Sequence, residues 1–153
     1  MRENDFNTIV SHSLSSLENG FGYKIPDTFA SDSFKRSKAP YDGYGFFNKH
    51  FVCWESKYLN NPSSFNFNNL QEHQIENLIK FYENIPNACY SLFLIGINFG
   101  RGDIRVFYWM NDDLYNIKER KLNKENIHKK EFLSLSNYIN IKKGLINFNE
   151  ILI

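Results

Sequence analysis

The sequence has little cysteine and no long apolar run. Its two cysteines, Cys53 and Cys89, lie in apolar, strand-like segments, so we expect reduced thiols rather than a disulfide. No apolar stretch approaches the roughly 18 residues that a membrane-spanning helix needs. The polar start Met-Arg-Glu-Asn-Asp is not followed by the apolar segment of a secretion signal. We therefore expect a cytoplasmic protein without membrane association.

A strong excess of charge of one sign and any internal repeat are also missing. The formal net charge is +1, so the overall field neither requires nor excludes a nucleic-acid partner. The aromatic content of 17% is typical of a folded globular protein. A length of 153 residues suits one hydrophobic core, and we expect residues 1–153 to form a single domain.

Hydrophobic periodicity predicts an alternation of helices and strands. Helices are expected over residues 5–18 and 69–84, the second with Asn68 or Asn69 available as its cap. Strands are expected over residues 21–25, 41–59 (as a hairpin), 89–99 and 104–110. Residues 26–40 form a predicted loop, and residues 111–153 a C-terminal helical part. This order favours an α/β or α+β fold with a central mixed sheet flanked by helices.

Two carboxyl residues face each other across the predicted hairpin. If Asn48-Lys49 is a two-residue turn, Asp42 lies opposite Glu55, and Lys57 shares their face. Facing carboxylates stand about 5 Å apart at Cβ and repel each other, so we expect a positive group between them. A hard divalent cation such as Mg²⁺ prefers this kind of oxygen site. It would activate water and stabilise charge on a phosphate, while Lys57 positions the nucleophile or neutralises the phosphate.

The same residues also have a purely structural interpretation. Asp42 would then end a strand, and Glu55 and Lys57 would belong to a solvated face, since short D…E-x-K patterns often arise by chance. The surroundings favour function, because ionisable side chains in a largely apolar segment require a reason. The apolar neighbours are Phe46, Phe47, Phe51, Val52 and Trp54.

The segment from Asp42 to Leu78 resembles the core of the RecU-type Holliday junction resolvases, a family within the PD-(D/E)XK nuclease superfamily. Three features match in register: Asp42, the E-x-K strand at residues 55–57, and the F-x-x-x-N…H-Q-I helix start at residues 65–75. The resemblance covers residues 42–110. It implies a restriction-endonuclease-like fold, a homodimer, dependence on Mg²⁺ or Mn²⁺, and cleavage of branched DNA at four-way junctions.

The resemblance also implies roles for single residues. Asp42 and Glu55 would be the metal ligands, and Lys57 the catalytic lysine. Gln74 would project from the start of the second helix toward the same catalytic site. The alternative for Gln74 is a glutamine that only caps or packs the helix.

The chain departs from the family pattern in two places. The family carries a glutamate on its first helix, where this chain has Phe6-Asn7, and neither Glu3 nor Glu18 is in the expected position. The family's long stalk, which enters the junction, is shortened here to residues 26–40. This stalk-like loop still carries a basic cluster that is our DNA-binding candidate, with a solvated loop as the alternative: Lys35, Arg36 and Lys38.

Three hypotheses follow for the function. The first is a junction resolvase that nicks two strands symmetrically as a dimer. The second is another PD-(D/E)XK nuclease, of phage or restriction type, that cuts other duplex DNA. The third is a catalytically silent DNA-binding accessory protein of recombination, which lost turnover through Asn7.

Overall fold

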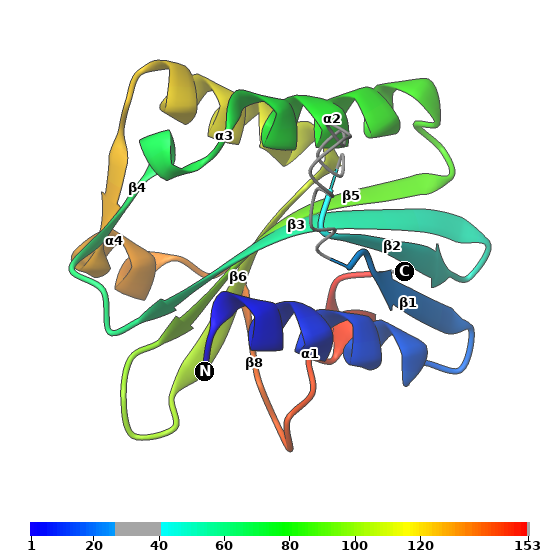
Figure 1. The fold of residues 1–153 in the computed structure, drawn as a ribbon, viewed down its shortest axis with the longest axis horizontal. Coiled ribbons are helices and arrows are strands. Elements are labelled where there is room, and N and C mark those ends of the chain that lie inside the picture. Colours follow the sequence, from blue (N-terminus) through cyan, green and yellow to red (C-terminus); the bar gives the residue numbers. More distant parts are fainter. Residues whose placement is uncertain (27–40, 153) are drawn as a thin grey trace, which may run out of the picture.

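The computed structural model describes residues 1–26 and 41–152, and its centre is a six-stranded mixed sheet (Figure 1). The strand order is β1-β2-β3-β5-β6-β8, with β3 and β5 parallel and the other pairs antiparallel. The strands are β1 (Gly20–Lys24), β2 (Gly43–Phe47), β3 (His50–Asn60), β5 (Cys89–Asn98), β6 (Ile104–Met110) and β8 (Tyr138–Asn140). A separate two-stranded sheet pairs β4 (Ser64–Asn66) with β7 (Asn126–His128).

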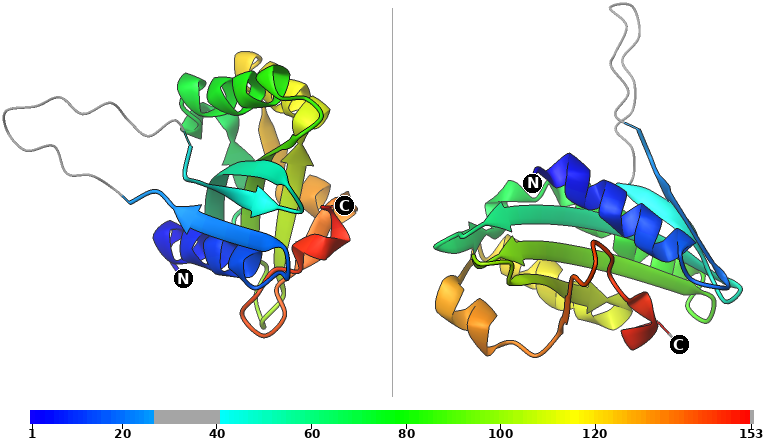
Figure 2. Two further views of the ribbon diagram at one scale, coloured as in Figure 1. Left: turned by 90° about the vertical axis from the view of Figure 1, so that its right-hand side faces the viewer. Right: turned by 90° about the horizontal axis from the view of Figure 1, so that it is seen from below.

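Helices cover both faces of the large sheet (Figure 2). The α-helices are α1 (Glu3–Ser15), α2 (Glu72–Asn84), α3 (Leu114–Leu122) and α4 (Lys129–Ser134). Short 3-10 turns occupy Phe67–Asn69, Asn111–Asp113 and Phe148–Glu150. No helix among the described residues is long and apolar enough to cross a membrane. The expected mixed sheet flanked by helices is confirmed.

Two hydrophobic cores lie on opposite faces of the sheet, because successive side chains of a strand point to opposite sides. On one face, Phe6, Val10 and Leu14 of α1 pack against Trp54 of β3. On the other face, a core that includes Cys53 packs beneath α2 and α3 through Ile75, Leu78, Ile79, Leu114 and Ile117. Both cysteines are buried free thiols, as expected. Strand β3 therefore presents alternate residues to each layer of helices.

The predicted hairpin is confirmed residue by residue. Gly43 pairs with Trp54 and Phe47 with His50, so the turn is Asn48-Lys49. Both turn residues have positive φ, at 49° and 68°, as a tight two-residue turn requires. Because a shift of one residue would move every side chain to the opposite face, this register determines which side chains of β3 share a face.

Two details differ from the sequence interpretation. Helix α2 begins at Glu72, and its cap is Gln71 rather than Asn68 or Asn69. The tail contains the expected helices, α3 and α4, but it also contributes the short strands β7 and β8. Strand β8 extends the large sheet beside β6, and the tail therefore becomes part of the central architecture.

Candidate active site

The candidate site lies beside Gly43, the first residue of β2, where β3 continues without β2 as its neighbour. Strand β2 pairs with β3 only as far as Trp54, whereas β3 runs on to Asn60. Within the described residues, the remaining part of β3 has no strand on this side. This open edge lies between the N-terminal ends of α1 and α2 (Figure 1). Gln74 of α2 contacts Glu55 there, and Glu3 of α1 contacts Lys57.

Asp42 is fixed at the end of the paired region by its own backbone. Its N–H donates to the Trp54 carbonyl at 2.9 Å, and its carbonyl accepts from the Ile25 N–H at 2.9 Å. Its carboxylate Oδ2 accepts from the Ser56 N–H at 2.8 Å and from the Ser56 Oγ at 3.2 Å. The Asp42 side chain thus replaces the backbone partner that a longer β2 would supply. It accepts a hydrogen bond from an N–H of the open edge that would otherwise be unpaired.

Glu55 is almost completely buried, with 2% of its surface exposed. Burial first, and then the nearby charge of Asp42, raise the pKa of Glu55 from 4.5 to about 9. Burial also raises the pKa of Asp42, although the Ser56 N–H and the charge of Lys57 oppose that rise. The two carboxyl groups lie near enough for each to affect the pKa of the other. Burial and the nearby charge of Asp42 therefore favour the protonated form of Glu55 when no cation is bound.

Gln74 connects the start of α2 to the carboxyl pair. Its Nε2 donates to Glu55 Oε1 at 2.5 Å, and its Oε1 accepts from the Gln71 N–H at 2.8 Å. The second bond belongs to the capping box of α2, so the helix cap orients the amide that contacts Glu55. Gln74 therefore caps α2 and contacts Glu55 with the same side chain, and its catalytic role stays a prediction.

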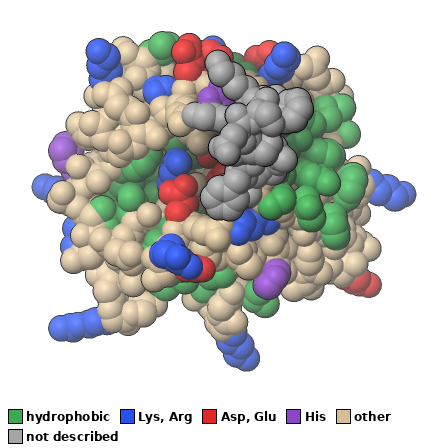
Figure 3. Space-filling model, in the orientation of Figure 1, with side chains coloured by type: hydrophobic (Ala, Val, Ile, Leu, Met, Phe, Trp, Pro, Cys, Tyr) green, Lys and Arg blue, Asp and Glu red, His purple; other side chains and the backbone are tan. Residues whose placement is uncertain are grey.

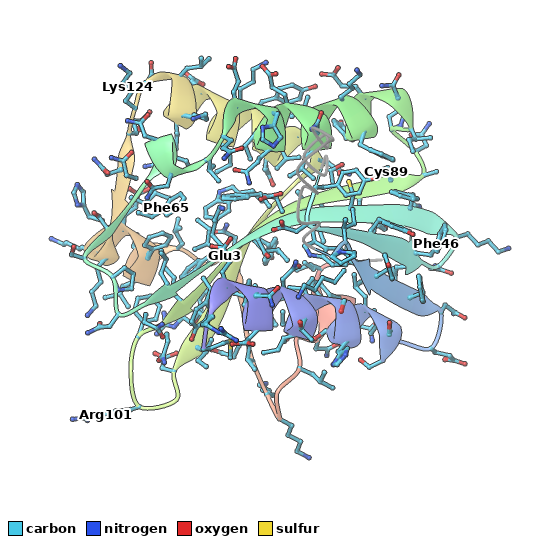
Figure 4. The ribbon with its side chains drawn as sticks, in the orientation of Figure 1. Glu3, Phe46, Phe65, Cys89, Arg101 and Lys124 are labelled. Carbon is cyan, nitrogen blue, oxygen red and sulfur yellow. The ribbon has the colours of Figure 1, made fainter. Side chains whose placement is uncertain are left out.

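Lys57 completes the group from the same strand face as Glu55. Its Nζ lies 3.4 Å from Glu3 Oε1, and its side chain is 16% exposed. Figure 4 shows Glu3 at the start of α1, where the helix approaches β3. Glu3 also lines a cavity of about 210 Å³ together with Asn4, Asn7 and Asp42. Glu3 therefore lies beside the candidate site, although it stands one turn before the position at which the family carries its glutamate.

The sequence contains a signal for Glu3 that the motif comparison missed. Glu3 precedes Asn7 by four residues, and residues at this spacing lie above one another on a helix. An acidic side chain one turn before Asn7 therefore reaches the same cavity. The first helix therefore places the carboxylate of Glu3 at this cavity, one turn before the position at which the family carries its glutamate.

Asn7 itself has a structural partner. Its Oδ1 accepts from Trp54 Nε1 at 2.6 Å, and only 7% of Asn7 is exposed. The bond ties α1 to β3 directly behind the site. The indole in turn occupies the space above Gly43, where a Cβ would lie 2.0 Å from the Trp54 ring. Asn7, Trp54 and Gly43 therefore form a packed unit that supports Asp42, the neighbour of Gly43.

Removing the Asn7 amide should destabilise the protein. Asn7→Ala is expected to lower the free energy of unfolding by about 1–3 kcal/mol, because the buried indole N–H loses its acceptor. Urea denaturation monitored by Trp fluorescence measures this change. Asn4→Ala is the matched control, because Asn4 is exposed on the same helix and, among the described residues, makes hydrogen bonds through its backbone carbonyl rather than its side chain. Equal stabilities of the two variants would contradict the role of Asn7.

The donor set suits a divalent cation that prefers oxygen ligands. Within residues 1–26 and 41–152, no group of three or more His, Cys, Asp and Glu side chains has the arrangement of a metal site. The sequence predicts two ligands, Asp42 and Glu55, and Mg²⁺ sites commonly use one or two carboxylates completed by water and substrate phosphate. The charge of Asp42 raises the pKa of Glu55, so the two carboxyl groups lie near each other. The residues therefore fit the expected Mg²⁺ or Mn²⁺.

The predicted DNA-binding residues cannot be compared with this geometry. Lys35, Arg36 and Lys38 lie in residues 27–40, outside the described residues. Their role stays a prediction.

Comparison with known proteins agrees with the sequence motifs. The family model for RecU, described as Recombination protein U, matches residues 25–152. A similar solved structure is that of Archaeoglobus fulgidus Hjc, a Holliday junction resolvase from an archaeal hyperthermophile. It has 12% identity and a TM-score of 0.34, over 65% of this chain and 84% of that chain. No curated protein matches. Because the family match spans most of the sequence, the chain belongs to the RecU family of recombination proteins.

Proposed function

We propose that this protein is a cytoplasmic, metal-dependent endonuclease that resolves four-way DNA junctions. One observation carries the proposal: in a chain of the RecU family, the carboxyl groups of Asp42 and Glu55 meet Lys57 at the open edge of β3. Asp42 and Glu55 would hold Mg²⁺ or Mn²⁺, which supplies an activated water and charge stabilisation at the scissile phosphate.

The protein's own residues prepare this chemistry. Gln74 holds Glu55 in place, and the backbone bonds of Asp42 fix the second carboxyl group, so the ligands need little rearrangement. The Lys57 ammonium lies beside both carboxyls and lowers the pKa of each. Its proposed role is to neutralise charge that develops on the phosphate or to position the attacking water. Glu3 holds Lys57 in place through their ion pair.

We further propose that two copies cooperate, since a resolvase must cut two strands symmetrically. An exposed aromatic surface on β1 and β2 supports association: Phe21, Tyr23 and Phe46 are 47%, 44% and 49% exposed. Figure 3 shows hydrophobic side chains gathered over this end of the sheet. Large exposed apolar patches commonly mark interaction sites. Sedimentation should give twice the chain mass of 18.1 kDa, and a monomer at micromolar concentration would contradict the dimer.

The decisive experiment compares a synthetic four-way junction with a linear duplex of the same sequence. Paired, symmetric nicks in the junction with Mg²⁺ or Mn²⁺, absent with EDTA, are expected for a resolvase. Equal cleavage of both substrates would favour another PD-(D/E)XK nuclease. Junction binding without cleavage in either metal would favour the silent accessory protein.

Lys57→Ala should separate binding from turnover. One ammonium adds little to a phosphate footprint spread over many contacts, but it acts where charge develops. Cleavage at saturating metal is expected to fall by about 10²–10³-fold, with junction affinity in Ca²⁺ changing less than threefold. Lys118→Ala is the control, because Lys118 lies on α3 rather than on β3. An affinity loss as large as the rate loss would make Lys57 a binding residue.

A further inference from the structure

Ser56, between Glu55 and Lys57, contacts Asp42 with both of its donors. Its N–H and its Oγ both donate to Asp42 Oδ2, at 2.8 Å and 3.2 Å. The residue is fully buried, with 0% of its surface exposed. The middle position of the E-x-K motif therefore holds a group that acts on the facing carboxylate.

The hydroxyl of Ser56 has no evident packing purpose. Alternation along β3 gives Ser56 the orientation of Trp54 and Tyr58, which belong to the apolar core beneath α1. A buried hydroxyl is costly there unless it makes a hydrogen bond. Among the described residues, the Oγ of Ser56 makes a hydrogen bond only to Asp42. Alanine would suit the core equally well, so the hydroxyl needs a reason connected with Asp42.

Two donors on one carboxylate oxygen fix the rotation of the whole group. The backbone N–H alone allows the carboxylate to pivot around Oδ2, whereas a second donor from another direction removes that freedom. Neither bond uses Oδ1. We propose that Ser56 is a positioning residue that fixes the Asp42 carboxylate with Oδ1 available to a divalent cation. This inference rests on the proposed function, because it requires Asp42 to be a metal ligand.

The test measures binding of Mn²⁺ to the DNA-free protein, by electron paramagnetic resonance of the unbound ion. Hydrogen-bond partners of ligating carboxylates typically contribute about 10–100-fold to metal affinity. Ser56→Ala is therefore expected to weaken Mn²⁺ binding about tenfold, and Ser56→Thr, which keeps a hydroxyl, to restore most of it. Ser91→Ala is the matched control, because Ser91 is also fully buried but contacts the two cysteines. It should bind Mn²⁺ normally.

A second pair keeps the test valid if alanine disturbs folding. Ser56→Thr and Ser56→Val have nearly the same shape and differ only in the hydroxyl, so any affinity difference reports the hydrogen bond. Equal Mn²⁺ affinities of the Thr and Val variants would overturn the inference while leaving the proposed function intact. Failure of the unaltered protein to bind Mn²⁺, or to cleave the junction, would instead overturn the proposed function and this inference with it.

Discussion

Glu55→Gln is expected to abolish junction cleavage and leave the fold intact. Glutamine has nearly the shape of the protonated acid, and its Oε1 can accept from Gln74 as the acid does. The variant lacks the anionic oxygen needed by a cation and by the developing phosphate charge. We expect cleavage to fall by about a thousandfold or more.

The measurement is single-turnover cleavage of a labelled junction at saturating protein and Mg²⁺, together with thermal melting of both proteins. Glu76→Gln, an exposed change on α2, is the control and should cleave normally. Retention of cleavage by Glu55→Gln would place the catalytic centre elsewhere. A large loss of melting temperature with cleavage preserved would make Glu55 a structural residue.

The metal-free protein should lose stability as the pH rises from about 5 to about 9. Folding raises the pKa of Glu55 from 4.5 to about 9. In this window the folded state keeps a proton that the unfolded chain has released, so each pH unit favours unfolding by up to about 1.4 kcal/mol. The Asp42 pKa is raised as well, which acts in the same direction. Each effect disappears only below the unfolded-state pKa of its group, which is 4.5 for Glu55 and 3.8 for Asp42.

Urea denaturation in EDTA at several pH values checks this dependence. Glu55→Gln should flatten most of the slope, because the titrating group is gone, and should be the more stable protein at pH 8. Mn²⁺ should stabilise the unaltered protein more as the pH rises, since the metal binds only the deprotonated ligands. Identical slopes for the two proteins would show that Glu55 ionises freely.

The hairpin was predictable because local rules determine it. Two-residue turns fix the register of the strands on either side, so the pairing of Gly43 with Trp54 followed from the position of Asn48-Lys49. The same register, continued by one residue, places Asp42 opposite Glu55. The resemblance to the RecU family rested on this segment as well, and the family match confirms it.

Features that depend on how helices lie across the sheet were not predictable. Periodicity identifies the buried face of α1, but not how far along β3 its first turn reaches, so it did not indicate that Glu3 lies beside Lys57. Gln74 can both cap α2 and contact Glu55 because the helix cap is Gln71. The sequence predicted Asn68 or Asn69 as the cap, so this arrangement was not expected. Strands β7 and β8 have three residues each, with one buried residue apiece, too few for an alternating pattern.

The open edge of β3 has a consequence for solubility. An unpaired strand edge is a template for pairing with another chain, and proteins protect such edges with charged side chains. Here Asp42 occupies the first free N–H of the edge, and Lys57 places a charge beside it. The groups proposed to cut DNA therefore also block intermolecular strand addition. Variants that remove them, Asp42→Ala above all, should aggregate more readily than the unaltered protein when concentrated.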